Sequence, residues 1–142
     1  MSIIEKMSKI VVVTGAGTGV GRRVAEVLSK ECMVVYLIGR WNDKLIETQN
    51  LCSGETEVLQ CDVSDPQAVK NAFEIVEKDH SRIDVLFNNA GITEGGFFDE
   101  VPYQKHMEII NINIIGVING IYSAANLLKN TPNSLCISTS SS

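Results

Sequence analysis

The chain has 142 residues, of which 44% are hydrophobic and 20% charged, and its formal net charge is −5. This length and composition predict one globular domain over residues 1–142, with residues 1–8 as a flexible lead-in, and exclude general disorder. The acidic balance and the absence of a Lys/Arg run argue against nucleic acid or an anionic membrane as partner. Because no stretch reaches about 18 uninterrupted apolar residues and the first residues resemble no leader peptide, we expect a cytoplasmic protein with no membrane span.

The cysteines and histidines do not form a metal-binding pattern. The four cysteines lie far apart, without a C-x-x-C pair or a neighbouring His, and both histidines are isolated. We therefore expect no metal site and no redox dithiol, and we interpret the cysteines as buried thiols.

Apolar runs of strand length alternate with helical patterns along the whole chain. The expected strands are 9–14, 33–38, 57–61, 83–87 and 134–138. The expected helices are 20–30, 43–52, 66–79 and 103–129. The third helix is marked by Pro66 in its first turn and by a capping box of Ser64 and Gln67. Alternating strands and helices predict an α/β fold with a parallel, doubly wound Rossmann-type sheet of order 3-2-1-4-5, whose ligand crevice lies at the carboxyl ends of the strands.

The first expected strand runs directly into a glycine-rich turn, Thr14-Gly15-Ala16-Gly17-Thr18-Gly19-Val20-Gly21. Such a turn leaves backbone N–H groups and the positive end of a helix dipole facing outward, which suits a dinucleotide diphosphate. The spacing T-G-x-x-x-G-x-G resembles that of the short-chain dehydrogenase/reductase family. The alternative is an ordinary strand-to-helix turn, in which four glycines in seven residues would be entropically wasteful.

The resemblance implies that five residues of this turn bind a nicotinamide cofactor: Gly15, Thr18, Gly19, Val20 and Gly21. In that pattern the first glycine permits the tight turn, the second lets the backbone approach a phosphate, and the third lets the helix pack closely on the strand.

The cofactor variant is indicated by the end of the second strand. NAD-selective sites place a carboxylate there to bind the ribose 2′-OH, but this chain has Gly39 followed by Arg40. A guanidinium can pair with a 2′-phosphate, so we expect NADP(H) to be preferred, with NAD(H) possible. Asp43 is explained by the dipole of the next helix. Trp41 either covers the adenine or simply packs.

Two further motifs follow strands three and four. Asp62-Val63 resembles the family's adenine-binding pair, although an Asp shortly before Ser64 is also common in an ordinary loop or turn. Asn88-Asn89-Ala90-Gly91 resembles the family's tetrapeptide that ties the central strand to its neighbours through the first Asn and lines the cofactor with Asn89, Ala90 and Gly91.

The resemblance also supplies candidate catalytic residues. Asn113, inside the apolar helix 103–129, corresponds to an Asn that holds a water of a proton relay at a local helix distortion, although Asn111 and Asn119 show that this helix uses Asn freely. Thr139 or Ser140 corresponds to the hydroxyl that polarises the substrate carbonyl, depending on a one-residue shift in alignment.

The family pattern continues beyond residue 142 with a proton-donating Tyr in Y-x-x-x-K. We therefore expect an NADP(H)-dependent oxidoreductase acting on a carbonyl or secondary alcohol, with the C-terminal part of the fold missing and this chain alone inactive. We also expect it to be marginally stable, because helix 103–129 is apolar on nearly every side. A homo-oligomer is expected only with the following helices. The alternatives are a non-catalytic truncated relative that binds dinucleotides or a partner, and a fragment that binds nothing.

Overall fold

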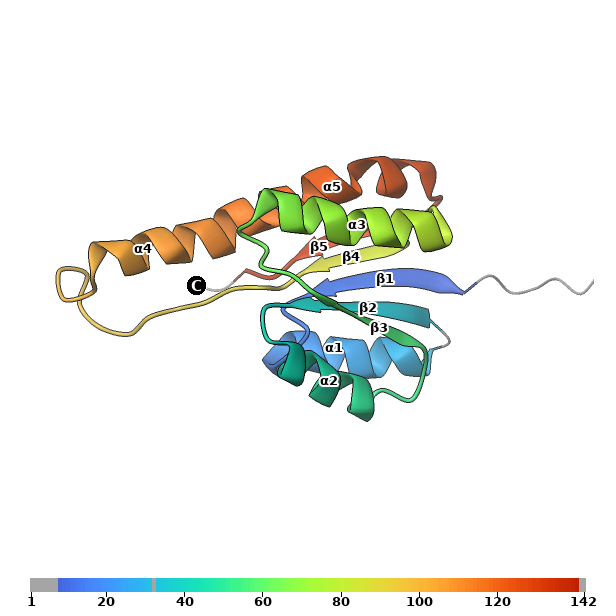
Figure 1. Ribbon diagram of the computed structural model, residues 1–142, viewed down its shortest axis with the longest axis horizontal. Coiled ribbons are helices and arrows are strands. Elements are labelled where there is room, and N and C mark those ends of the chain that lie inside the picture. Colours follow the sequence, from blue (N-terminus) through green and yellow to red (C-terminus); the bar gives the residue numbers. More distant parts are fainter. Residues whose placement is uncertain (1–7, 32, 141–142) are drawn as a thin grey trace, which may run out of the picture.

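The computed structural model describes residues 8–31 and 33–140. Its centre is a parallel sheet of order β3-β2-β1-β4-β5, which confirms the predicted order, with helices on both faces (Figure 1). The strands are β1 (Lys9–Thr14), β2 (Met33–Gly39), β3 (Thr56–Gln60), β4 (Val85–Asn88) and β5 (Leu135–Ser138). The helices are α1 (Gly19–Lys30), α2 (Asn42–Leu51), α3 (Pro66–His80), α4 (Tyr103–Ile110), the π-helical η1 (Asn111–Ile115) and α5 (Gly116–Asn130).

The central strands are buried because both faces of the sheet are covered. Val11, Val12 and Val13 of β1 are fully buried, as expected for continuous β-branched runs in a parallel sheet. One side of the sheet packs against α1 and α2 through Ala25 and Leu45, and the other side packs against α3 and α5 (Figure 1). These two cores fix the strand ends that carry the predicted motifs.

Element boundaries agree with the sequence to within about two residues, with two corrections. Asp65, not Ser64, caps α3: its carboxylate accepts hydrogen bonds from the N–H groups of Gln67 and Ala68. The Ser64 hydroxyl instead donates to Asp62, 2.7 Å away. The single long helix expected over 103–129 is also interrupted, because η1 separates α4 from α5. The expected lead-in, apart from Ser8, lies outside the described residues.

The open flank of the fold is apolar. Ile114 and Ile118 of the long helical segment are each 54% exposed, and Leu135 and Ile137 of the edge strand β5 are exposed as well. By length and mean hydropathy the segment Tyr103–Asn130 could cross a membrane, although core helices of soluble proteins pass the same test. In this fold 22% of the most apolar window of that segment is buried, and Leu127 of α5 packs in the core between the sheet and the helices on that face.

Candidate cofactor site

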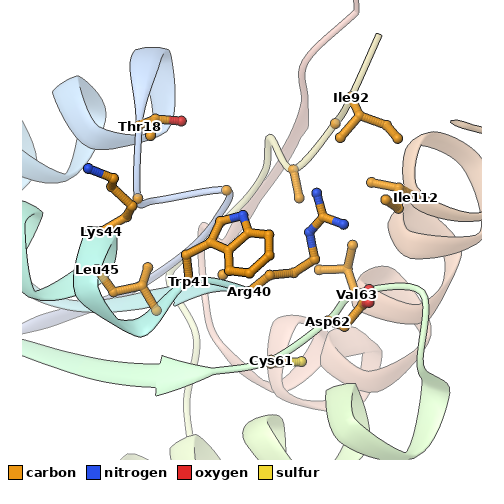
Figure 2. Close-up of a pocket in the computed structure, with 15 residues that line it drawn as sticks. Thr18, Arg40, Trp41, Lys44, Leu45, Cys61, Asp62, Val63, Ile92 and Ile112 are labelled. Atoms are coloured by element: carbon orange, nitrogen blue, oxygen red, sulfur yellow. The ribbon is translucent and has the colours of Figure 1, made fainter. Parts of the chain in front are cut away.

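A cavity of about 260 Å³ opens at the carboxyl ends of β1, β2, β3 and β4. Its lining combines the glycine turn with the predicted motifs that follow β2, β3 and β4, including Gly15, Thr18, Arg40, Asp62 and Ala90, whereas Thr139 and Ser140 after β5 do not line it. Figure 2 shows Thr18 and Lys44 on one side of the cavity, Ile92 and Ile112 on the other, and Trp41 beside Arg40 between them. Residues that are distant in the sequence therefore meet at one site, as the topology predicts.

The glycine turn has the backbone geometry that requires glycine at two positions. Gly15 has φ +66° and lies so close to β4's end that an added Cβ would be 2.8 Å from the Ala90 Cα. Gly19 has φ +55° and faces open space, so its backbone is accessible to a ligand. Thr18, which precedes α1, makes no side-chain cap hydrogen bond within the described part of the chain. The first N–H groups of α1 therefore remain available to an anion.

Gly21 lies in close contact with the turn and with the residue that follows β4. A Cβ at Gly21 would lie 2.2 Å from the Gly15 carbonyl oxygen and 2.7 Å from Asn89 Nδ2. Its lack of a side chain thus lets the start of α1 approach the carbonyl that directly follows β1 and the side chain of Asn89 after β4.

Three side chains hold the turn in place, and two of them, Thr48 and Arg22, lie outside the predicted motifs. Thr14 Oγ1 accepts hydrogen bonds from the backbone N–H groups of Asn89 and Ala90, at 3.0 and 3.1 Å. The buried Thr48 hydroxyl donates to the Ala16 carbonyl at 2.8 Å, and the Arg22 guanidinium donates to the Gly17 carbonyl. These contacts preorganise the turn, and the longest of them connects residues 76 apart, which no local pattern indicates.

Arg40 lies at the mouth of the cavity with its charge only loosely paired. Its Nη1 is 3.6 Å from Glu108 Oε1 of α4, and its guanidinium carbon lies 5.6 Å from the centre of the Trp41 ring. Trp41 is 64% exposed, so much of its indole ring remains accessible beside that guanidinium. Gly39 lies against Leu45: an added Cβ would be 3.1 Å from Leu45 Cδ2. Because Gly39 has no side chain and Arg40 carries a guanidinium, the end of β2 presents a cation and no carboxylate.

Asp62 and Val63 form the wall contributed by the end of β3. Asp62 Oδ1 accepts from the N–H and hydroxyl of Ser64 at 2.9 and 2.7 Å, the turn that the loop interpretation predicts. Asp62 nevertheless lines the cavity. Asn119 of α5 donates to the Val63 carbonyl at 2.8 Å, so it fixes this wall rather than lying free on the surface.

A hydrogen-bonded chain joins the end of β5 to the glycine turn. The Thr139 hydroxyl donates to Asn89 Oδ1 at 2.9 Å, and Asn89 Nδ2 donates to the Gly15 carbonyl at 3.4 Å. Asn88 joins β5 through its backbone, because its carbonyl accepts from the Thr139 N–H at 2.9 Å. The buried side-chain nitrogen of Asn88 has no partner among the described residues. Ser140, the next residue after Thr139, is exposed, as is Gly91.

Asn113 lies within the π-helical turn η1, the type of helix distortion that the family resemblance implied. Its side chain brackets the backbone of Ile92: Oδ1 accepts from the Ile92 N–H and Nδ2 donates to the Ile92 carbonyl, both at 2.8 Å. The amide therefore ties the segment after β4 to the helix that covers it.

The cavity also contains a cysteine, Cys61. Burial is the main cause that raises the pKa of the Cys61 thiol to about 11, so this cavity-lining thiol stays protonated at neutral pH. Across residues 8–31 and 33–140, no group of three His, Cys, Asp or Glu side chains could hold a metal ion.

A parallel sheet of this order with an uncapped helix behind a glycine turn defines the class of dinucleotide-binding α/β proteins. Within that class, the family model for short chain dehydrogenase matches residues 9–142. The chain therefore belongs to the short-chain dehydrogenase/reductase family.

Its relatives include both NAD and NADP proteins. Human 15-hydroxyprostaglandin dehydrogenase [NAD(+)] is 34% identical over 125 residues, covering 80% of this chain and 42% of that protein. A short-chain dehydrogenase/reductase from Burkholderia phymatum in complex with NAD has a TM-score of 0.88 at 28% identity, covering 94% of this chain and 49% of that one. An alcohol dehydrogenase from Thermococcus sibiricus complexed with 5-hydroxy-NADP has a TM-score of 0.86 at 26% identity, covering 92% and 57%. The chain thus spans about half the length of the proteins it matches.

Proposed function

We propose that this chain is the cofactor-binding part of an NADP(H)-dependent oxidoreductase, which transfers hydride between the nicotinamide and a carbonyl or secondary alcohol of a small molecule. The N–H groups at Gly19 and Val20, at the start of α1, bind the diphosphate in this proposal. Asp62 and Val63 bind the adenine, and Asn89, Ala90 and Gly91 line the ribose and nicotinamide. A cytoplasmic location, consistent with the acidic composition, is part of the same proposal.

The observation that carries the NADP preference is the combination of Gly39 and Arg40 at the end of β2. The relatives bind either cofactor, so the preference rests on these residues alone. The Arg40 guanidinium is 34% exposed, and its contacts among the described residues are a 3.6 Å ion pair and the nearby Trp41 ring, so it can form charge-assisted hydrogen bonds with a phosphate. Position 39 is a glycine, so it carries no carboxylate that would repel the phosphate or bind a 2′-hydroxyl.

The hydroxyl that polarises the substrate carbonyl comes from the segment after β5 in this proposal. The Thr139 hydroxyl proton is directed to Asn89 Oδ1, so Thr139 must rotate before it can donate to a substrate. Ser140, exposed beside it, is the alternative donor. Asn113 holds a water in the proton relay. Because the family's Tyr and Lys follow this segment, we propose that the 142-residue chain alone binds cofactor without turnover.

Titration with NADPH and NADH tests the proposal. We expect NADPH to bind at least tenfold more tightly, and Arg40→Ala to abolish that difference by weakening NADPH alone. Arg23→Ala is the matched control, because Arg23 lies on α1 with a side chain that is 67% exposed. If neither NADPH nor NADH binds, the proposed function is refuted. An unchanged ratio of NADPH to NADH affinity in Arg40→Ala would refute the NADP preference.

A further inference from the structure

The cation assigned to the cofactor's extra phosphate is already paired with an acid. Arg40 follows β2, whereas its partner Glu108 lies on α4. Both residues line a second cavity of about 360 Å³, which adjoins the first at Arg40 and also reaches Asp62. In Figure 2 the guanidinium lies between Trp41 and Ile112. The ion pair therefore holds Arg40 toward α4.

Glu108 is held in place independently of Arg40. Its Oε2 accepts a hydrogen bond from Lys105 Nζ at 3.0 Å, one turn earlier on α4, and Lys105 Nζ also lies 3.7 Å from Glu94. The hydrogen bond from Lys105 is the main cause that lowers the pKa of Glu108. Glu108 is thus an ionised, positioned carboxylate at neutral pH, whether or not Arg40 is engaged elsewhere.

The pair between Arg40 and Glu108 is weak enough for a phosphate to displace. Its atoms are 3.6 Å apart, and the two side chains are 34% and 41% exposed, so water competes with the ion pair. A phosphate monoester carries up to two charges and accepts bidentate hydrogen bonds from a guanidinium. A bound 2′-phosphate would also lie near the Glu108 carboxylate, and like charges repel.

We propose that Glu108 is the resident counter-ion of Arg40, which the 2′-phosphate must displace, and that it thereby determines how strongly the site prefers NADPH over NADH. This inference rests on the proposed role of Arg40. Glu108 weakens NADPH binding in two ways: Arg40 must leave it, and its charge faces the incoming phosphate. NADH has a neutral 2′-hydroxyl and experiences neither effect.

The test is Glu108→Gln in the full-length protein, with dissociation constants measured for NADPH and NADH. The glutamine keeps the shape of the side chain and removes its charge. We expect NADPH to bind three- to tenfold more tightly and NADH to change less than twofold. The gain shrinks toward unity in 0.5 M salt, because exposed charges are screened. Glu74→Gln is the matched control: Glu74 forms a similar exposed pair with Lys70, 3.7 Å away on α3.

The double variant Arg40→Ala/Glu108→Gln identifies the route of the effect. If Glu108 acts through Arg40, the Glu108→Gln gain largely disappears in the Arg40→Ala background. A gain in NADPH affinity of the same size in both backgrounds would assign the effect to Lys105 or to the general charge of the protein, and would overturn the inference. The inference also fails if Glu108→Gln binds NADPH and NADH more tightly by the same factor, or if it binds NADPH no more tightly. If Arg40→Ala removes the NADPH preference while Glu108→Gln changes nothing, only this inference fails. If Arg40→Ala leaves the preference intact, the proposed function's assignment of Arg40 fails first.

Discussion

Introducing a carboxylate at position 39 should convert the site from NADPH to NADH. Gly39 ends β2, and a Cβ there would lie 3.1 Å from Cδ2 of the fully buried Leu45. Any side chain at position 39 therefore requires Leu45 to move by a few tenths of an ångström. Gly39→Ala makes the same contact without a charge, so the pair Gly39→Asp and Gly39→Ala separates electrostatics from packing.

The expected size of the change follows from two opposing contributions. Two unit charges about 6 Å apart repel by about 3 kcal/mol at an effective dielectric constant of about 20, and solvent at this open mouth reduces that to about 1.5 kcal/mol, or roughly tenfold for NADPH. A hydrogen bond from the ribose 2′-OH to the new carboxylate contributes about 1.5 kcal/mol to NADH binding. The NADPH/NADH ratio of affinities should therefore fall about a hundredfold relative to Gly39→Ala.

The assay is equilibrium titration of both variants with both cofactors, combined with a thermal unfolding curve for each variant. The two variants should share the same small loss of melting temperature, because both press on Leu45. Equal NADPH/NADH ratios in Gly39→Asp and Gly39→Ala would refute the assignment of the end of β2 to the 2′ position of the ribose.

Three further substitutions probe the scaffold of the site. In Gly21→Ala the new Cβ would collide with the Gly15 carbonyl oxygen, so we expect about 1–3 kcal/mol of destabilisation by overpacking and at least about tenfold weaker cofactor binding. Gly95→Ala is the control: its Cβ meets nothing within 4 Å, so neither stability nor cofactor binding should change. Asn113→Ala removes two 2.8 Å hydrogen bonds to Ile92 and should cost about 1–2 kcal/mol and speed proteolysis after β4; an unchanged unfolding midpoint would contradict this. Burial opposes ionisation of Asp84, but hydrogen bonds from Arg82 and a backbone N–H outweigh it and lower its pKa. Its contribution is therefore present above the unfolded value of about 3.9 and is lost as pH falls through the lower folded value, so urea titrations should show Asp84→Asn less stable at pH 7 and the difference shrinking below about pH 4.

The sequence predicts the sheet because its signals are local. Val11 to Val13 are buried on both faces, and runs of this kind between helical patterns specify a parallel sheet without knowledge of any distant contact. The strand order then brings Arg40, Asp62 and Ala90 to one cavity, so the location of the site follows from topology alone.

The details that the sequence does not predict depend on contacts between distant residues. The cap of α3 differs from the prediction because Asp65 is as good a cap as Ser64, and only the fold shows that the Ser64 hydroxyl is already bound to Asp62. Likewise, Thr48 and Glu108 carry no motif. Thr48 reaches the glycine turn from α2 through a hydrogen bond, and Glu108 reaches Arg40 from α4 through an ion pair.

The central claim is that the turn between Thr14 and Gly21 binds the diphosphate of NADPH, and a crystal structure of the protein soaked with NADPH tests it most directly. We expect the diphosphate to accept hydrogen bonds from the N–H groups of Gly19 and Val20. We also expect the 2′-phosphate to bind Arg40 and the ion pair between Arg40 and Glu108 to be broken. A cofactor bound elsewhere, or a diphosphate at the turn with the 2′-phosphate directed away from Arg40, would contradict it.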